Sequence, residues 1–256
     1  MNDPSYSDPI CNNPIYNNPL YMVRMDLDVE ALIQFIQQQG LNHGRDEDLG
    51  YATHAWLTAC FGPLAPKPYR IFPSQSSSIR MLGYSENPGQ ILTQRAETSG
   101  AETALAVLRQ TALDCTCLPE FWKLGQRYRF EVLICPVSRR LQSEKDVFLR
   151  YKEYVPANER LPSRSDVYRE WLRAQMLGAA GIQGFRLHSF KLVRLVRRTQ
   201  CRRGQPRLAP PMTRPQALCR GILSVEDPAR FDRLLRRGVG RHRAFGYGMV
   251  LLAPET

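Results

Sequence analysis

The chain has 256 residues, enough for one large domain or two small ones. With 43% hydrophobic and 9% aromatic residues, it has the composition of a folded chain and not of a disordered one. The 35 Lys and Arg residues outnumber the 24 Asp and Glu residues and give a formal net charge of +11. This excess favours a polyanionic partner such as nucleic acid, although a generic basic surface explains it too.

The seven cysteines stand at irregular spacings, and the close pair Cys115 and Cys117 lacks the second pair that a zinc site needs. An odd count without a secretory leader is typical of a reducing cytoplasm, where cysteines act as small apolar side chains. No apolar run approaches the roughly 18 residues of a membrane-spanning helix. We therefore expect a cytoplasmic protein with no metal, no cofactor and no membrane contact.

The first part of the chain reads as a leader followed by alternating strands and helices. Residues 1–19 are rich in Asn and Pro, which predicts a flexible leader. Periodicity then predicts, in chain order, a strand over 20–28, helices over 29–39 and 48–60, strands over 67–72 and 78–84, and a helix from 88 to about 110. Gly40 and the Gly62–Pro63 pair mark the ends of the first two helices.

The second part repeats that order. Its predicted elements are a strand over 127–137, a helix over 166–177 capped by Ser165, strands over 184–198 and 217–227, a helix over 227–237 and a strand over 246–254. The pattern predicts an α+β fold of two tandem ferredoxin-like (RRM-like) domains over 20–120 and 121–256, with a helical insertion in the second. Such domains with a basic face favour RNA binding, although a fold alone proves no function.

A Gly-rich loop over 238–248 stands between an Arg-rich helix and the last apolar strand. Its glycines flank the basic residues Arg241, His242 and Arg243. Glycine allows close approach of backbone to backbone or phosphate, and free N–H groups can hold an anion, so the loop is predicted to grip phosphate. A single Gly-x-Gly pair also occurs in ordinary turns, whereas the whole string is more specific.

This C-terminal string resembles the closing signature of the CRISPR repeat-processing endoribonucleases of the RAMP superfamily, in particular the CasE branch and its type IV counterparts. The matching residues are Asp227, Pro228, Gly238, Gly240, Ala244, Phe245, Gly246 and Gly248. The segments GQRYRFEVLICPVSRR, YREWLRAQ, GFRLHSFKLVRLVRR and LGYATHAWLTACFG also resemble the family, so the likeness covers roughly residues 20–254. Residues 30–47 and 74–117 depart from the CasE pattern and favour a type IV relative.

The resemblance implies a metal-independent endoribonuclease that cleaves CRISPR precursor RNA within its repeat hairpins. In this chemistry the ribose 2′-hydroxyl attacks the adjacent phosphate, which leaves a cyclic phosphate and a 5′-hydroxyl. The enzyme is expected to keep its product hairpin within an interference complex with other subunits. His54 and Tyr51 match the family's Tyr-x-x-His pattern on the first helix, and a spacing of three places them on one helix face. An ordinary structural histidine is the alternative for His54.

Other residues compete for the catalytic role. His242 lies in the Gly-rich loop between two arginines, and Arg243 and Arg24 are further candidates. Arginines alone can also stabilise the transition state without an essential histidine. His43 and His188 are weaker candidates, because the first follows a helix end and the second alternates into a strand.

Basic clusters supply the predicted RNA contacts, since an A-form stem is gripped through its phosphates and 2′-hydroxyls. The predicted RNA-binding residues are Arg70, Arg139, Arg140, Lys191, Arg194, Arg197, Arg198, Arg202, Arg203, Gly238, Gly240, Arg241, Gly246 and Gly248. Strand alternation places Lys191 and Arg197 on one face but Arg194 and Arg198 on the other, so some of these charges only solvate the sheet.

The segment from 139 to 180 is longer than a crossover requires. A helical projection there would touch the hairpin stem or a neighbouring subunit, and a simple surface helix explains the segment equally well. Two other functions are compatible with the sequence. The chain could be a non-catalytic RNA-binding RAMP subunit of a CRISPR ribonucleoprotein, or a general RNA-binding scaffold unrelated to CRISPR. Neither accounts for Tyr51 and His54 together with the terminal glycine signature.

Overall fold

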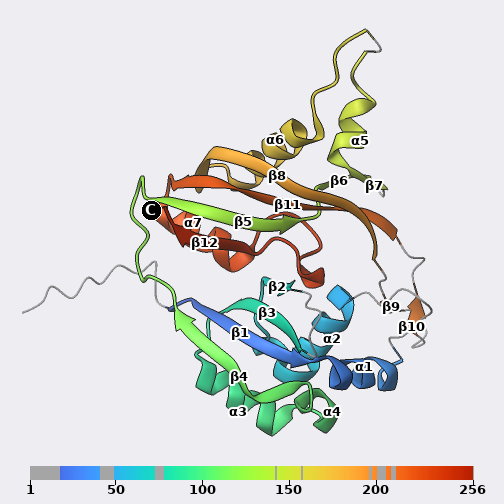
Figure 1. The fold of residues 1–256 in the computed structure, drawn as a ribbon, viewed down its shortest axis with the longest axis vertical. Helices are drawn as coiled ribbons and strands as arrows, with labels where there is room; N and C mark the ends of the chain where they lie inside the picture. The colour runs from blue at the N-terminus through green and yellow to red at the C-terminus, as the bar shows by residue number, and fades with distance from the viewer. Residues whose placement is uncertain are drawn as a thin grey trace, which may run out of the picture.

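The structure is a computed structural model, and it describes residues 18–40, 49–72, 78–141, 143–156, 158–195, 198–200, 206–208 and 212–255. The predicted leader falls almost wholly outside these residues. The fold is a mixed α/β arrangement of two four-stranded antiparallel sheets, one in each half of the chain (Figure 1).

The N-terminal half contains β1 (Tyr21–Asp28), α1 (Val29–Gln38), α2 (Leu49–Phe61), the 3-10 turn η1 (Gly62–Leu64), β2 (Tyr69–Phe72), β3 (Ser78–Ser85), α3 (Gly89–Ser99), α4 (Glu102–Leu105) and β4 (Leu108–Cys117). The first strands and helices agree with the predicted ones. Asp28 caps α1 by accepting a hydrogen bond from the backbone N–H of Ala31 at 3.0 Å, because a carboxylate there satisfies a helix donor that has no intrahelical partner. The strand order is β2-β3-β1-β4.

One prediction in this half is wrong. The helix expected from 88 to about 110 ends at Ser99, a short helix follows, and β4 begins at Leu108. β4 is an edge strand paired only with β1, with Cys115 opposite Val23. An edge strand buries little of its surface and lacks a clear period-two pattern, so pairing with β1 decides its structure.

The C-terminal half contains β5 (Arg127–Ile134), β6 (Val137–Arg140), β7 (Ser143–Asp146), α5 (Val147–Lys152), α6 (Arg164–Met176), β8 (Ala180–Leu195), β9 (Arg198–Gln200), β10 (Pro206–Leu208), β11 (Met212–Val225), α7 (Pro228–Arg237), the 3-10 turn η2 (Arg243–Phe245) and β12 (Val250–Pro254). The main sheet has the order β12-β5-β11-β8. Numbered within each half, both main sheets therefore run fourth, first, third, second.

Several boundaries differ from the predicted ones. Ser163, not Ser165, caps α6, since its hydroxyl accepts from the N–H of Asp166 at 3.1 Å. The last strand begins at Val250, because residues 246–249 belong to the loop that precedes it. β8 and β11 start earlier than predicted because their long hairpin pairs from Ala180 opposite Val225 up to Leu195 opposite Met212.

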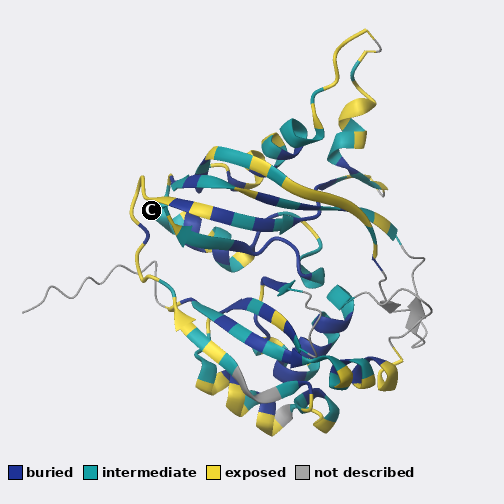
Figure 2. Cartoon of the chain, viewed as in Figure 1, coloured by how far each residue is buried: buried dark blue, intermediate teal, exposed yellow. Residues whose placement is uncertain are grey.

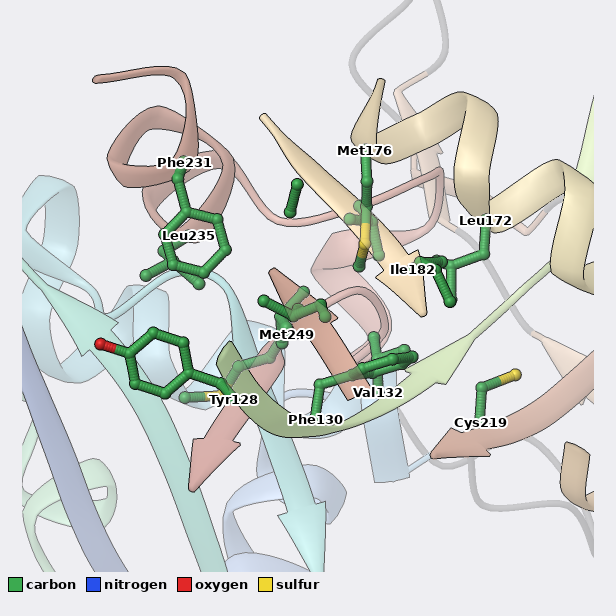
Figure 3. Close-up of a cluster of buried hydrophobic side chains, with 14 of the residues drawn as sticks. Tyr128, Phe130, Val132, Leu172, Met176, Ile182, Cys219, Phe231, Leu235 and Met249 are labelled. Atoms are coloured by element: carbon green, nitrogen blue, oxygen red, sulfur yellow. The ribbon is translucent and has the colours of Figure 1, made fainter. Parts of the chain in front are cut away.

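The two halves of the chain contribute side chains to one hydrophobic cluster. Figure 3 shows the core of the C-terminal half, where Phe231 and Leu235 of α7 and Leu172 and Met176 of α6 cover one face of the sheet. Tyr84 of the N-terminal half joins this cluster, and its hydroxyl donates to the carbonyl of Val250 at 2.7 Å. The halves therefore meet through a buried contact.

The segment between β5 and α6 forms the predicted insertion, although it is only partly helical. The β6–β7 hairpin, α5 and an irregular stretch precede α6, and the connection between α5 and α6 projects from the body (Figure 1). Many residues of this projection and of the middle of β8 are exposed to solvent (Figure 2).

Candidate active site at the junction of the halves

Tyr51 and His54 lie on α2, one helical turn apart. The core-facing side of α2 carries Trp56, Leu57 and Phe61, all fully buried. Tyr51 and His54 are each half-buried, so they lie at the margin of the core and are reachable from outside. The expected placement of the pair on one helix is confirmed, whereas its catalytic role stays a prediction.

His54 has the environment of a proton acceptor. Its Nδ1 atom is buried, and within the described part of the chain no group hydrogen-bonds to it. Burial, and secondarily the positive charge of Lys67, lowers the pKa of His54 from its usual value of 6.5. The imidazole is therefore neutral at neutral pH, the form that can accept a proton, whereas its Nδ1 atom is too buried to meet RNA.

Lys67 is a further residue near His54, and the sequence gives no sign of it. It lies just before β2, is exposed, and carries the charge that acts on His54. An isolated lysine in a Pro-rich connection has no local signal of function. Its nearness to His54 depends on how β2 packs against α2, which sequence periodicity does not reveal.

The Gly-rich loop packs directly against this helix. The hydroxyl of Tyr69 lies 2.8 Å from the carbonyl oxygen of Gly50 and 2.7 Å from that of Ala244, so it joins the start of α2 to the loop. The rings of Tyr51 and Phe245 face each other with centroids 6.0 Å apart. The structure thus brings together the two regions that carry the sequence resemblance.

The glycines of the loop serve close packing. Gly238 and Gly248 adopt φ of +71° and +83°, and a Cβ atom at Gly248 would collide with the carbonyl of Val239. A Cβ at Gly240 would lie 2.6 Å from the ring of Trp171, and one at Gly246 3.4 Å from the ring of Tyr69.

The predicted phosphate binding by the loop would need backbone N–H groups that are free to donate to an anion. The N–H groups of Gly238, Gly246 and Gly248 donate to the carbonyls of Leu234, Arg243 and Leu133. These three donors are therefore used inside the fold, and RNA contact by these glycines stays a prediction that these bonds do not support.

The competing catalytic residues have partners of their own. His242 Nε2 lies 2.8 Å from Oε2 of Glu144, and Arg243 donates to the carbonyl of Arg237 at 2.6 Å. Burial and the charge of Arg237 lower the pKa of Arg243 from its usual value. Arg24 lies on β1 and pairs with Asp26 at 3.1 Å. His188 is exposed on β8, and His43 lies outside the described residues.

The predicted RNA-binding side chains differ in their environments, and their contact with RNA stays a prediction. Arg70 is buried between the halves and pairs with Glu131 at 2.7 Å, which accounts for its charge without RNA. Arg139 and Arg140 are exposed on β6, and Lys191 and Arg194 are exposed on β8. Arg241 is exposed and donates to Glu144 at 2.6 Å. Arg197, Arg202 and Arg203 fall outside the described residues, and for Arg198 only the backbone, in β9, is described.

The residues that the structure describes contain no group of three or more His, Cys, Asp and Glu side chains arranged to hold a metal ion. They likewise contain no helix long and apolar enough to span a membrane. Cys60, Cys135 and Cys219 are buried in the hydrophobic clusters, as predicted for small apolar side chains.

Fold and site together define a mixed α/β protein with a His–Tyr helix docked against a Gly-rich loop. The chain belongs to the family described as "CRISPR associated protein", whose model matches residues 20–254. The resemblance noted in the sequence is confirmed at the level of the family.

Solved structures with the same fold agree with this assignment. One is a CRISPR endoribonuclease Cse3 bound to a 19-nucleotide RNA, at 16% identity, 91% coverage of this chain, 100% of that chain and a TM-score of 0.59. Another is Thermus thermophilus Cse3 bound to an RNA that represents a pre-cleavage complex, at 17% identity, 92% and 100% coverage and a TM-score of 0.55. A chain of a CRISPR RNA-guided surveillance complex, pre-nicking, is similar at 14% identity, 93% and 100% coverage and a TM-score of 0.52.

At these identities the similarity shows the fold alone. No curated protein is similar enough in sequence to match the chain.

Proposed function

We propose that this protein is a metal-independent endoribonuclease that cleaves CRISPR precursor RNA within its repeat hairpins and keeps the mature guide RNA. The observation that carries the proposal is His54, a half-buried histidine with a lowered pKa, beside Lys67 and on the helix that meets the Gly-rich loop. Endoribonuclease activity and bound RNA in the structurally similar Cse3 proteins support it.

The proposed reaction uses the neutral imidazole as a base. His54 accepts the proton of the ribose 2′-hydroxyl, whose oxygen then attacks the adjacent phosphorus. The bond from phosphorus to the 5′-oxygen breaks, and this oxygen takes a proton from solvent, which leaves a cyclic phosphate and a 5′-hydroxyl. Lys67 stabilises the negative charge on the phosphoryl oxygens, and Tyr51 orients the phosphate from the same helix.

The proposed architecture is a pair of tandem ferredoxin-like domains over 20–120 and 121–256. The order of strands in both main sheets, fourth, first, third, second, supports it, as does the repeated succession of strand, helix, strand, strand, helix, strand. The structurally similar chain from a surveillance complex supports the proposal that other subunits of an interference complex are partners. Assignment to the CasE or the type IV branch stays a prediction.

The test of the proposed function is cleavage of a labelled repeat hairpin in excess EDTA. We expect cleavage to persist when divalent ions are removed, because the proposed proton transfer and charge stabilisation come from side chains. The product ends should be a cyclic phosphate and a 5′-hydroxyl, resolved by mass spectrometry and by phosphatase treatment. Tight binding without cleavage would instead make the chain a non-catalytic RNA-binding subunit.

The lowered pKa of His54 predicts the pH dependence of the reaction. Only the neutral imidazole accepts a proton, so the single-turnover rate should rise with pH through the pKa of His54 and then level off. Because that pKa lies below 6.5, the midpoint of the rise should also lie below 6.5. Rates measured from pH 4.5 to 8.5 in buffers of constant ionic strength check this, and a midpoint above the usual histidine value would contradict it.

A further inference from the structure

Glu144 lies on β7 in the insertion, and three cationic or basic side chains converge on its carboxylate. Arg241 Nε donates to Oε1 at 2.6 Å, and Arg214 Nε of β11 donates to Oε2 at 3.1 Å. His242 Nε2 lies 2.8 Å from the same Oε2, in a hydrogen bond that the carboxylate accepts. Two of the three groups belong to the Gly-rich loop, and Glu144 belongs to a separate hairpin.

Most of this Glu144 cluster is shielded from solvent. The side chains of Glu144, His242 and Arg214 are only 11%, 12% and 15% exposed, so their contacts are screened far less than surface pairs, whereas Arg241 is 47% exposed. Burial by itself would raise the pKa of Glu144, but hydrogen bonds from His242 and Arg241 and the charge of Arg214 hold that pKa below its ordinary value. The carboxylate is therefore charged at neutral pH.

The loop needs such a hold because His242 has an unfavourable backbone conformation. Its φ and ψ of 59° and 29° lie in the left-handed region, which a residue with a Cβ adopts at a cost in free energy. The hydrogen bond from the imidazole to Glu144 offsets this cost. Arg241 is held by the same carboxylate, so Glu144 secures two consecutive residues of the loop.

A continuous set of contacts leads from His242 to the candidate catalytic helix. The ring of His242 packs against the ring of Phe245 with centroids 5.8 Å apart, and Phe245 in turn faces Tyr51 at 6.0 Å. The carbonyl of Ala244, which precedes Phe245 in the chain, accepts a hydrogen bond from the hydroxyl of Tyr69. A shift of His242 would therefore move the wall against which Tyr51 is set.

We propose that Glu144 is a positioning residue for the RNA-cleavage site, which acts by holding Arg241 and His242 so that the Gly-rich loop stays docked on Tyr51. The inference rests on the proposed function and deepens it, because it links the insertion to the reaction. It also assigns His242 to the support of the loop and leaves His54 as the base.

The first test replaces Glu144 with glutamine, which keeps the shape and removes the charge. At saturating RNA the single-turnover cleavage rate of Glu144→Gln should fall about 10- to 100-fold, the size expected for a displacement of roughly 1 Å, with an RNA dissociation constant close to that of the wild type. The control is Asp146→Asn on the same strand. Asp146 is buried, and its carboxylate binds Arg164 and Tyr168 of α6 where Glu144 binds Arg241 and His242 of the loop, so this change should lower the melting temperature but spare the rate. Equal losses of rate in both variants would show a merely structural role.

A second readout does not depend on cleavage. Backbone hydrogen exchange over residues 239–246 should accelerate in Glu144→Gln and not in Asp146→Asn. Unchanged exchange in Glu144→Gln would overturn the inference. If the wild type failed to cleave, the proposed function would fall, while the exchange would still decide the role of Glu144.

Discussion

Replacement of His54 by alanine is expected to lower the single-turnover rate of repeat cleavage by about two to four orders of magnitude, the usual contribution of a positioned general base. The cause is the loss of the neutral imidazole, whose pKa is lowered by burial and by the charge of Lys67. RNA affinity should change little, since His54 acts on the attacking hydroxyl. The measurement is cleavage of labelled hairpin at saturating protein, alongside a filter-binding titration with His54→Ala.

The matched control for this change is Thr58→Ala. Thr58 lies one turn further along α2 and is exposed, and its hydroxyl donates to the backbone carbonyl of His54. A similar small change to the helix without loss of the imidazole should leave cleavage intact. Full activity of His54→Ala would remove this residue from the mechanism and favour the arginine-only alternative. Loss of activity in both variants would point to damage to the helix.

Gly248→Ala is the second change with a large expected effect. Gly248 combines a φ of +83° with a backbone approach so close that a Cβ would meet the carbonyl of Val239. Its N–H donates to Leu133 at 2.8 Å, and its carbonyl accepts from Val239 at 2.9 Å. An alanine cannot fit unless these bonds shift, so the free energy of unfolding should fall by about 2–4 kcal/mol. Cleavage should also fall about 100-fold, because the loop no longer docks on Tyr51.

Gly125→Ala separates backbone strain from collision. Gly125 has a φ of +77°, but no atom lies within 4 Å of the position that a Cβ would occupy. Its replacement should therefore lower the free energy of unfolding by only about 1 kcal/mol, the strain of an alanine in the left-handed conformation. Urea unfolding of both variants, with the slope compared to that of the wild type, gives the two values. Equal destabilisation would mean that the close contact of Gly248 with Val239 has no energetic weight.

The candidate site is built from residues of both halves of the chain. His54 and Lys67 come from the N-terminal half, whereas the loop that packs against Tyr51 comes from the C-terminal half. The contacts that join the halves here are the hydroxyl of Tyr69, which lies near two backbone carbonyls, and the tilted rings of Tyr51 and Phe245. Any change that separates the halves should therefore reduce cleavage even where no reacting group is altered.

The sequence by itself determined much of the local structure and the family. The limits of α1, α2 and α7 follow from apolar periodicity and from caps such as Asp28 and Asp227, which act within one turn of the helix. The pairing of Tyr51 with His54 on one helix needs only a spacing of three residues. The resemblance to the CRISPR-associated family rested on the terminal glycine string, and the family model matches over 20–254.

Only the tertiary structure decided how these parts work together. Tyr69 joins Gly50 to Ala244 across a sequence separation of 175 residues between Tyr69 and Ala244, which no local pattern encodes. No local pattern encodes the nearness of Lys67 to His54 or the hydrogen bond between His242 and Glu144, because these contacts arise from the docking of separate elements. Periodicity does not predict β4 for the same reason, since an edge strand is defined by its partner β1 and not by its own sequence pattern.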